Sequence, residues 1–285
     1  MSHASSQPMV SESESGSAAP LLTLERITKR YGGLPAVDDL SFSVRTGETL
    51  GVIGPNGAGK STLIGLVGGA LAPTTGVVRF QGRDITTLSP HQRAHLGIAR
   101  TFQVAQPFAG LSVHENVIVG ALFGGRAHSR AEAARIADEV IERTRLTAKA
   151  RYRGDELTVA DRKRLEMARA LALRPRLLLL DEVMAGLTPT EVEQAVHLIR
   201  EINQSGVTLV VVEHIMKAIR GVSDRVLVIH FGKRIAEGAP EQVLADPRVI
   251  EAYLGERYAK RNQAQPRTTF ERSDETATDS GEGSA

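Results

Sequence analysis

The sequence contains no cysteine, which excludes disulfide frameworks and thiolate metal sites and permits a reducing cytosol. It also has no long apolar run. The longest, residues 63–72, contains three glycines and is far shorter than the ~18 residues that cross a bilayer. A large excess of one charge is missing too, because the chain has 35 basic and 33 acidic residues. The pI of about 9.0 therefore does not indicate a nucleic-acid surface.

The two ends of the chain are poor in apolar residues. Residues 1–20 are rich in serine and lack the apolar segment of a secretory signal, and residues 260–285 are similarly polar. We expect disordered tails over 1–20 and 260–285. The 41% hydrophobic and 24% charged residues of the chain allow a core, so residues 21–259 are predicted to form one domain.

Residue patterns predict an α/β fold. Residues 40–44 alternate apolar and polar side chains, and residues 22–31 and 77–85 do so less regularly, which together predict an early antiparallel β region. A short apolar run at 49–53 leads into a glycine-rich turn and a helix from Lys60. Residues 89–173 have a helical pattern, and Ser129 with Glu132 resembles a capping box at the start of one helix. The residues expected on the buried face of that helix are Ala133, Ile136, Ala137, Val140 and Ile141.

Two very apolar runs, 177–180 and 207–212, are typical of central parallel strands. A helix between them carries an apolar stripe, so strand, helix and strand form a βαβ unit. The stripe consists of Val192, Ala195, Val196 and Ile199. No internal repeat is present, which predicts a single nucleotide domain.

A glycine-rich motif over 54–62 fits the pattern G-x-x-x-x-G-K-[ST]. Its residues are Gly54, Pro55, Asn56, Gly57, Ala58, Gly59, Lys60, Ser61 and Thr62. Backbone N–H groups of such a loop cradle phosphates at a helix N-terminus. Lys60 would reach the β- and γ-phosphates and the Ser61 hydroxyl would bind Mg²⁺. A plain turn between strand and helix is the alternative interpretation, but the strand before and the helix after are the context that the motif requires.

Polar residues follow both apolar runs. Asp181 and Glu182 end the first and Glu213 and His214 end the second, so all are expected at one sheet edge beside the glycine-rich loop. Asp181 would hold Mg²⁺ through water, and Glu182 would deprotonate the attacking water. An acidic helix cap is the alternative for Asp181 and Glu182. His214 is placed to reach a γ-phosphate.

These motifs, in this order, resemble the ATP-binding cassette family over roughly residues 22–255. The resemblance implies a P-loop (RecA-like) core with an antiparallel β subdomain and a helical subdomain inserted at about 89–173. It also implies that Tyr31 stacks on adenine and that Gln103 contacts Mg²⁺ and water from a loop that senses the membrane subunit. Residues around 103–119 would then transmit motion to that subunit.

Two family motifs are altered here. The signature loop, commonly Leu-Ser-Gly-Gly-Gln in the family, is Leu-Thr-Val-Ala-Asp at 157–161. Thr158 keeps the hydroxyl and Ala160 the backbone N–H that would contact nucleotide on a facing subunit. Asp161 would turn back to its own helix, with residues 162–164 offsetting its charge. Thr188 replaces a usual aspartate, and with Pro189 and Glu191 it predicts a helix start.

The resemblance implies an ATPase that uses ATP and Mg²⁺, pairs with a second cassette and binds permease subunits on the cytoplasmic, inner face of the membrane. An external binding protein would act indirectly, and no nucleic acid is expected. The ends of the family domain, at 237–243 and 246–255, resemble importers of branched-chain and other hydrophobic amino acids; urea or amides are the alternative cargo.

Three other functions are alternatives. A nucleotide sensor with little hydrolysis would fit Asp161 and Thr188. A soluble cassette of DNA repair or translation would need two cassettes or long insertions, and a GTPase would need an Asn-Lys-x-Asp motif; the sequence has none of these.

Overall fold

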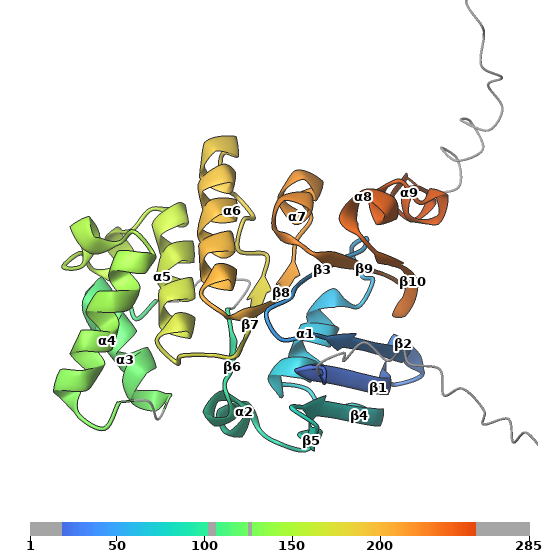
Figure 1. Cartoon of the computed structure of the whole chain (residues 1–285), viewed down its shortest axis with the longest axis horizontal. Helices are drawn as coiled ribbons and strands as arrows, with labels where there is room; N and C mark the ends of the chain where they lie inside the picture. Colours follow the sequence, from blue (N-terminus) through green and yellow to red (C-terminus); the bar gives the residue numbers. More distant parts are fainter. Residues whose placement is uncertain (1–18, 102–106, 125–126, 255–285) are drawn as a thin grey trace, which may run out of the picture.

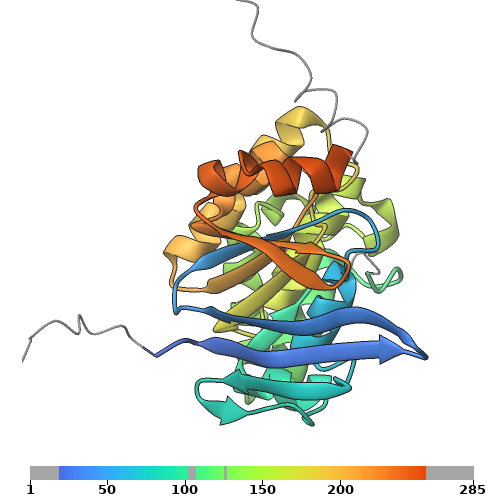
Figure 2. The ribbon, with the colours of Figure 1, turned by 90° about the vertical axis from the view of Figure 1, so that its right-hand side faces the viewer.

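Two β-sheets and a separate group of helices form the part of the chain described by the computed structural model, which covers residues 19–101, 107–124 and 127–254 (Figure 1). The six-stranded sheet lies at the centre. The four-stranded sheet lies on one side of it with helix α1 between them, and α6 and α7 cover the opposite face (Figures 1 and 2). None of the helices in these ranges is long and apolar enough to cross a membrane.

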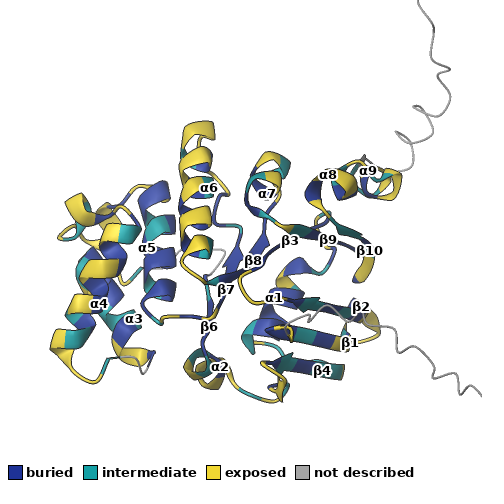
Figure 3. Cartoon of the chain, in the orientation of Figure 1, coloured by how far each residue is buried: buried dark blue, intermediate teal, exposed yellow. Residues whose placement is uncertain are grey.

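The six-stranded sheet has the order β10-β9-β3-β8-β7-β6. Its strands are β3 (Thr49–Ile53), β6 (Ile98–Arg100), β7 (Leu177–Asp181), β8 (Thr208–Val212), β9 (Arg225–His230) and β10 (Lys233–Gly238). All neighbours pair in parallel except β9 and β10. Every residue of β3, β7 and β8 is buried (Figure 3), because side chains alternate between two apolar layers. Leu178 packs into one core and Leu179 into the other.

The predicted βαβ unit is confirmed by β7, α6 (Pro189–Gln204) and β8. Val192, Ala195 and Ile199 are buried, whereas Val196 is only partly buried. The second strand begins at Thr208, one residue later than predicted.

The four-stranded sheet, in the order β2-β1-β4-β5, is the predicted antiparallel region. It contains β1 (Leu22–Tyr31), β2 (Leu34–Val44), β4 (Thr75–Phe80) and β5 (Arg83–Asp84). Within this region, a hairpin turn that the sequence analysis did not identify divides residues 77–85 between two strands. Gln81 and Gly82 have φ of 52° and 76°, as a two-residue hairpin loop requires.

The region 89–173 is mostly helical, as predicted. It contains α2 (Pro90–Leu96), α3 (Val113–Phe123), α4 (Arg130–Arg143), α5 (Val159–Leu171) and the short 3₁₀ helices η1 (Thr147–Lys149) and η2 (Gly154–Glu156). The prediction missed β6, a three-residue strand that exists because it pairs with β7. Gly97, with φ of 101°, ends α2 and directs the chain into this strand.

Helix α4 bears out its predicted buried face, since all five apolar residues are buried. Ser129 caps it by accepting a hydrogen bond from the Glu132 N–H. The reciprocal bond of a capping box does not form, because the Glu132 carboxylate accepts from the His128 N–H.

Four further helices complete the described part of the chain. They are α1 (Lys60–Gly68), α7 (Met216–Val222), α8 (Pro240–Leu244) and α9 (Pro247–Leu254). The last three lie on the face of the six-stranded sheet opposite α1 (Figure 1). Most of the two predicted tails, 1–20 and 260–285, lies outside the described residues, so disorder there stays a prediction.

Candidate functional site

The glycine-rich loop joins the end of β3 to the start of α1. Gly59 has φ of 106°, and a Cβ there would lie 2.2 Å from the Ala36 carbonyl oxygen. Only glycine fits such a position. The loop lines a cavity of about 740 Å³ together with Ala36, Glu182 and His214. Residues from three separate strand ends therefore face one space, as the motif positions predicted.

The Lys60 ammonium group is held within this loop. The residue is 5% exposed, and Nζ donates to the Gly54 and Pro55 carbonyl oxygens at 2.7 and 3.0 Å. Burial lowers the pKa of Lys60, although Glu182 and Asp181 act in the opposite direction. A buried cation at a helix N-terminus makes this cavity suited to an anion such as a phosphate group.

Asp181 ends β7 and is 1% exposed. Its Oδ2 lies 3.5 Å from Arg100 Nη2, whereas the buried Oδ1 has no hydrogen-bond partner among the described residues. Burial raises the pKa of this carboxyl, and Arg100 opposes the shift. An orphaned buried carboxylate oxygen needs a partner, and a hard divalent cation would supply one.

The donor set fits Mg²⁺ in particular. Ser61 lies in the first turn of α1 and lines the same cavity as the loop. No group of three or more acidic or histidine side chains that could hold a metal occurs in the described ranges. Mg²⁺ commonly takes one or two protein ligands and completes its shell with water and substrate phosphates. Asp181 and Ser61 match that pattern.

Glu182 and His214 meet across the ends of β7 and β8. Glu182 Oε1 lies 2.5 Å from His214 Nε2, and the Glu182 N–H donates to the Val212 carbonyl at 2.9 Å. Glu182 has φ of 50°, which is costly for a residue other than glycine and is typical of functional sites. The carboxylate is thus held at the cavity wall by backbone and by imidazole.

Glu213 is a member of this edge to which the sequence assigned no role. It is 1% exposed, and its Oε1 accepts a 2.7 Å hydrogen bond from the Met184 N–H. Burial raises the pKa of Glu213 to about 7, and its backbone hydrogen bonds oppose this. Its position after an apolar strand was a signal for burial, but only the fold shows that it ties β8 to the loop after Glu182.

One of the remaining predicted contacts lies outside the cavity wall, and another cannot be located among the described residues. Tyr31 is the last residue of β1 and is 52% exposed; Lys29 Nζ lies 5.4 Å from its ring centroid. It does not line the cavity of the glycine-rich loop. Gln103 falls outside the described residues, so its role stays a prediction.

Thr158 and Ala160 stand at the start of α5, away from that cavity. Thr158 is the N-cap: its Oγ1 accepts from the Asp161 N–H at 3.2 Å and donates to Asp161 Oδ2 at 2.7 Å. The Asp161 side chain therefore turns back to its own helix, as expected. Ala160 is 8% exposed.

The charge of Asp161 is offset only in part as predicted, by Arg164 but not by Arg162 or Lys163. Lys149, from η1, donates a short hydrogen bond to Asp161, and Arg164 lies at 3.6 Å. Burial alone would raise the pKa of Asp161, but Lys149 and Thr158 outweigh it and hold the pKa below its usual value. Arg162 and Lys163 instead donate to the carbonyls of Asp155 and Glu182. No sequence signal marks Lys149, since it belongs to a different turn.

The predicted helix start at Thr188 is confirmed. Thr188 caps α6, Pro189 is its first residue, and Glu191 completes a reciprocal capping box. Thr188 Oγ1 and its N–H both donate to Glu191 Oε2 at 2.8 Å.

The sequence of the chain is similar to those of known transport ATP-binding proteins. A family model described as "ABC transporter" matches residues 37–185, and one described as "Branched-chain amino acid ATP-binding cassette transporter" matches 233–259. The chain is 37% identical to the high-affinity branched-chain amino acid transport ATP-binding proteins LivG of Salmonella typhimurium and BraF of Pseudomonas aeruginosa. Each alignment covers 83% of this chain and 98% of the relative.

Solved structures agree with this similarity. A nucleotide-free ATP-binding cassette from an ABC transporter has a TM-score of 0.77 at 32% identity, over 84% of this chain and all of that one. The ADP conformation of an ATP-binding cassette of an ABC transporter gives 0.75 at 32% identity, with the same coverage. A dimeric post-hydrolysis cassette bound to ADP and Pi gives 0.70 at 26% identity, over 77% and 98% of the two chains.

Proposed function

The chain belongs to the ATP-binding cassette family, and on that premise we propose that it binds and hydrolyses Mg-ATP to energise an importer of branched-chain or other hydrophobic amino acids. The observation that carries the proposal is the single cavity in which Lys60, Glu182 and His214 meet. The match of residues 233–259 to the branched-chain model and the names of the LivG and BraF relatives support the cargo.

Different residues of the cavity have different roles in the proposed reaction. The loop 54–59 and the first turn of α1 bind the phosphates through backbone N–H groups, and Lys60 neutralises their charge. Asp181 and Ser61 would hold Mg²⁺, which supplies charge neutralisation between the phosphates when bound. Tyr31 and Gln103 are the proposed adenine and water contacts.

Glu182 acts as the general base in this proposal. Its carboxylate takes a proton from the attacking water, and His214, 2.5 Å away, keeps it oriented. The backbone bond from Glu182 to Val212 fixes the carboxylate at the end of the sheet. Such positioning supplies much of the rate in phosphoryl transfer.

The permease binds, we infer, at an apolar depression between α3 and α5. This cavity, about 380 Å³, is lined by Phe108, Phe123 and Arg100 among others, and Phe123 is 73% exposed. Arg100 also lies 3.5 Å from Asp181. One side chain thus borders both the depression and the Mg²⁺ site, which gives the permease a direct route to it. The cassette would then be peripheral on the cytoplasmic face of the membrane.

A second cassette completes the assembly. In the proposed head-to-tail dimer, Thr158 and Ala160 of one chain face the phosphate loop of the other. The dimeric structures of similar cassettes support a pair of cassettes. The partner is a second copy or a related subunit. An external binding protein and the permease select the cargo, so urea or amides remain the alternative.

A nucleotide sensor is the second candidate, because one observation favours it. The Thr158 hydroxyl donates its hydrogen bond to Asp161. It therefore cannot donate one to a phosphate at the same time. This leaves ATP binding at Lys60 intact while weakening turnover.

ATP hydrolysis by the purified full chain tests the proposal. We expect Glu182→Gln to bind ATP as the wild type does and to lose about 10²- to 10⁴-fold in turnover, because the base is removed without loss of shape. Glu142→Gln, at an exposed position of α4, is the matched control and should turn over normally. ATP binding without hydrolysis by the wild type would favour the sensor.

A further inference from the structure

A groove follows strand β10 along the edge of the six-stranded sheet. Two cavities, about 650 and 690 Å³, share Arg234, Ile235 and Arg248 and so form one depression. The five consecutive residues 234–238 border the first. Successive side chains of a strand point to opposite faces, so a space bordered by five in a row runs along the edge. Within the described ranges β10 pairs only with β9, which leaves its outer backbone groups without a strand partner.

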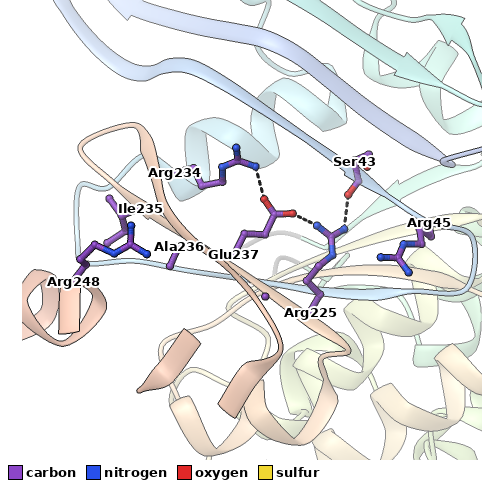
Figure 4. A pocket seen from close by; sticks show the side chains of 9 residues that line it. Ser43, Arg45, Arg225, Arg234, Ile235, Ala236, Glu237 and Arg248 are labelled. Carbon is purple, nitrogen blue, oxygen red and sulfur yellow. Dashed lines mark hydrogen bonds and ion pairs between the residues drawn. The ribbon is translucent and has the colours of Figure 1, made fainter. Parts of the chain in front are cut away.

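Arginines outnumber carboxylates in the lining. Four arginines (Arg45, Arg225, Arg234 and Arg248) and one carboxylate, Glu237, border the first cavity (Figure 4), and a second carboxylate, Glu251, borders the other.

Arg225 forms the floor of the groove, and all three of its guanidinium nitrogens already donate hydrogen bonds within the protein. Its Nε and Nη2 donate to Glu48 at 2.7 and 3.0 Å, Nη2 also donates to the Ser43 carbonyl at 2.5 Å, and Nη1 pairs with Glu237. It holds β2, the β2–β3 turn and β10 together and is not available to a ligand.

The other three arginines form a rim around the groove, and each has guanidinium N–H groups that make no hydrogen bond with the described residues. The Arg45 guanidinium makes no hydrogen bond or ion pair with any described residue. Arg234 pairs through Nη1 with Glu237 at 2.6 Å, and Arg248 is 70% exposed and pairs with Asp246. They come from the β2–β3 turn, from β10 and from α9, and Figure 4 shows them spread along the groove rather than converging on one point. Spaced guanidinium groups beside an open strand edge fit an extended acidic peptide better than one compact anion.

The chain itself carries such a peptide. Residues 271–285 contain five acidic residues and one arginine, and they follow α9, the helix that contributes Arg248 to the rim. Sixteen residues separate Leu254 from Glu271, and a chain of that length spans up to about 55 Å. The segment can therefore reach the groove of its own molecule at an effective concentration of the order of millimolar.

We propose that the acidic segment 271–285 docks along β10 of the same chain, with its carboxylates paired to Arg45, Arg234 and Arg248. Each exposed pair is individually weak, so docking depends on several pairs together. It is also sensitive to salt, because the Debye length falls from about 10 Å at 0.1 M to about 3 Å at 1 M.

A distance measurement on the full chain tests this directly. Because the protein has no cysteine, Thr46→Cys, next to Arg45, and Ser280→Cys provide two unique sites for spin labels. At low salt we expect a short, narrow distance population by double electron–electron resonance, lost at 1 M salt. Arg45→Glu with Arg248→Gln should lower the docked-to-free ratio by about fivefold or more, whereas Arg135→Glu, an exposed arginine of α4, should not change it.

The tail provides a second, independent variant. Asp274→Asn, Glu275→Gln, Asp279→Asn and Glu282→Gln together leave every described residue unchanged, and they should abolish the short population even if an arginine variant fails to fold. A broad distribution in the unaltered tail at low salt overturns the proposal. So does a short distance that appears only between mixed, singly labelled chains, which assigns the groove to a second copy. Binding of anionic vesicles that requires Arg45 while the tail stays distant also overturns it. None of these readouts depends on ATP hydrolysis.

Discussion

At the scale of single residues, the loop at 157–161 encloses the charge of Asp161 within its own local structure. Asp161 is 5% exposed and is enclosed by Thr158, Lys149 and Arg164. The carboxylate is therefore neutralised within its own chain and does not project toward a facing nucleotide. The carboxylate also accepts the hydrogen bond of the Thr158 hydroxyl, which under the proposed function would otherwise be offered to a phosphate.

Replacing Asp161 separates these two effects. Asp161→Gln should release the Thr158 hydroxyl and raise ATP turnover, while loss of the ion pairs lowers the free energy of unfolding by about 1 kcal/mol. Steady-state hydrolysis and chemical denaturation measure the two quantities. Asp155→Asn, which breaks an exposed pair with Arg153, is the control. Turnover that falls in proportion to stability would assign Asp161 a purely structural role.

Glu213 predicts a pH dependence of stability. Burial raises its pKa to about 7 in the folded protein, above its unfolded value of about 4.3. The folded state therefore holds the proton more tightly, and its stability declines as pH rises from about 4.5 to about 7. The total effect is of the order of 3 kcal/mol.

Thermal unfolding of Glu213→Gln across this range tests that sign. The variant keeps an oxygen for the Met184 N–H but cannot ionise, so it should gain stability over the wild type above pH 7 and match it near pH 4.5. Glu142→Gln should follow the wild-type curve. Parallel curves for wild type and Glu213→Gln would contradict the raised pKa.

At the scale of elements, helix starts and strand ends position the residues of the site. The capping boxes of α2, α3 and α6 fix where each helix begins, and β3, β7 and β8 end at the same sheet edge. Parallel strands deliver their carboxyl ends together, so the loop 54–59, Asp181–Glu182 and Glu213–His214 must be neighbours. The strained φ of Glu182 is tolerated because the bond to Val212 restrains it.

The cap of α6 has a measurable contribution. Thr188→Ala removes both hydrogen bonds of the Thr188 hydroxyl and should cost about 1 kcal/mol, a decrease in melting temperature of about 2–4 °C for a domain of this size. Thr188→Ser keeps the hydroxyl and should unfold like the wild type. Equal losses for both substitutions would point to packing of the Thr188 methyl group instead of the cap.

At the scale of the whole molecule, the two proposed sets of nucleotide contacts lie at different places on one chain. Thr158 and Ala160 lie at the start of α5, outside the cavity that contains Lys60. One chain therefore cannot use both sets of contacts on the same nucleotide in the proposed arrangement.

The proposed dimer predicts that association depends on nucleotide. With Mg-ATP, Glu182→Gln should elute on gel filtration at twice the 30.6 kDa mass of the chain, because ATP stays bound and unhydrolysed. Adding Lys60→Ala should return it to one chain by removing the phosphate contact. A monomer under both conditions would indicate that the partner is a different cassette.

Much of this architecture was predictable because the signals were local. The βαβ unit, the buried face of α4 and the cap at Thr188 each depend on periodicity or on residues three or four apart, and all three are confirmed. The hairpin at 81–82 and strand β6 were missed. The first depends on two backbone angles, and the second is too short to show a period without its neighbour β7.

The sequence alone determined the chemistry of the site, because the glycine-rich loop and the acidic strand ends must occur as fixed residue types at fixed spacing. Tertiary structure decided which charges meet. Lys149 reaches Asp161, Arg100 reaches Asp181, His214 reaches Glu182, and Glu213 reaches the backbone of Met184. The same holds for the arginine groove along β10, whose members come from four separate segments. The four contacts join residues 12 to 81 positions apart. Local periodicity does not encode such contacts, because only the packing of the two cores brings these elements close together.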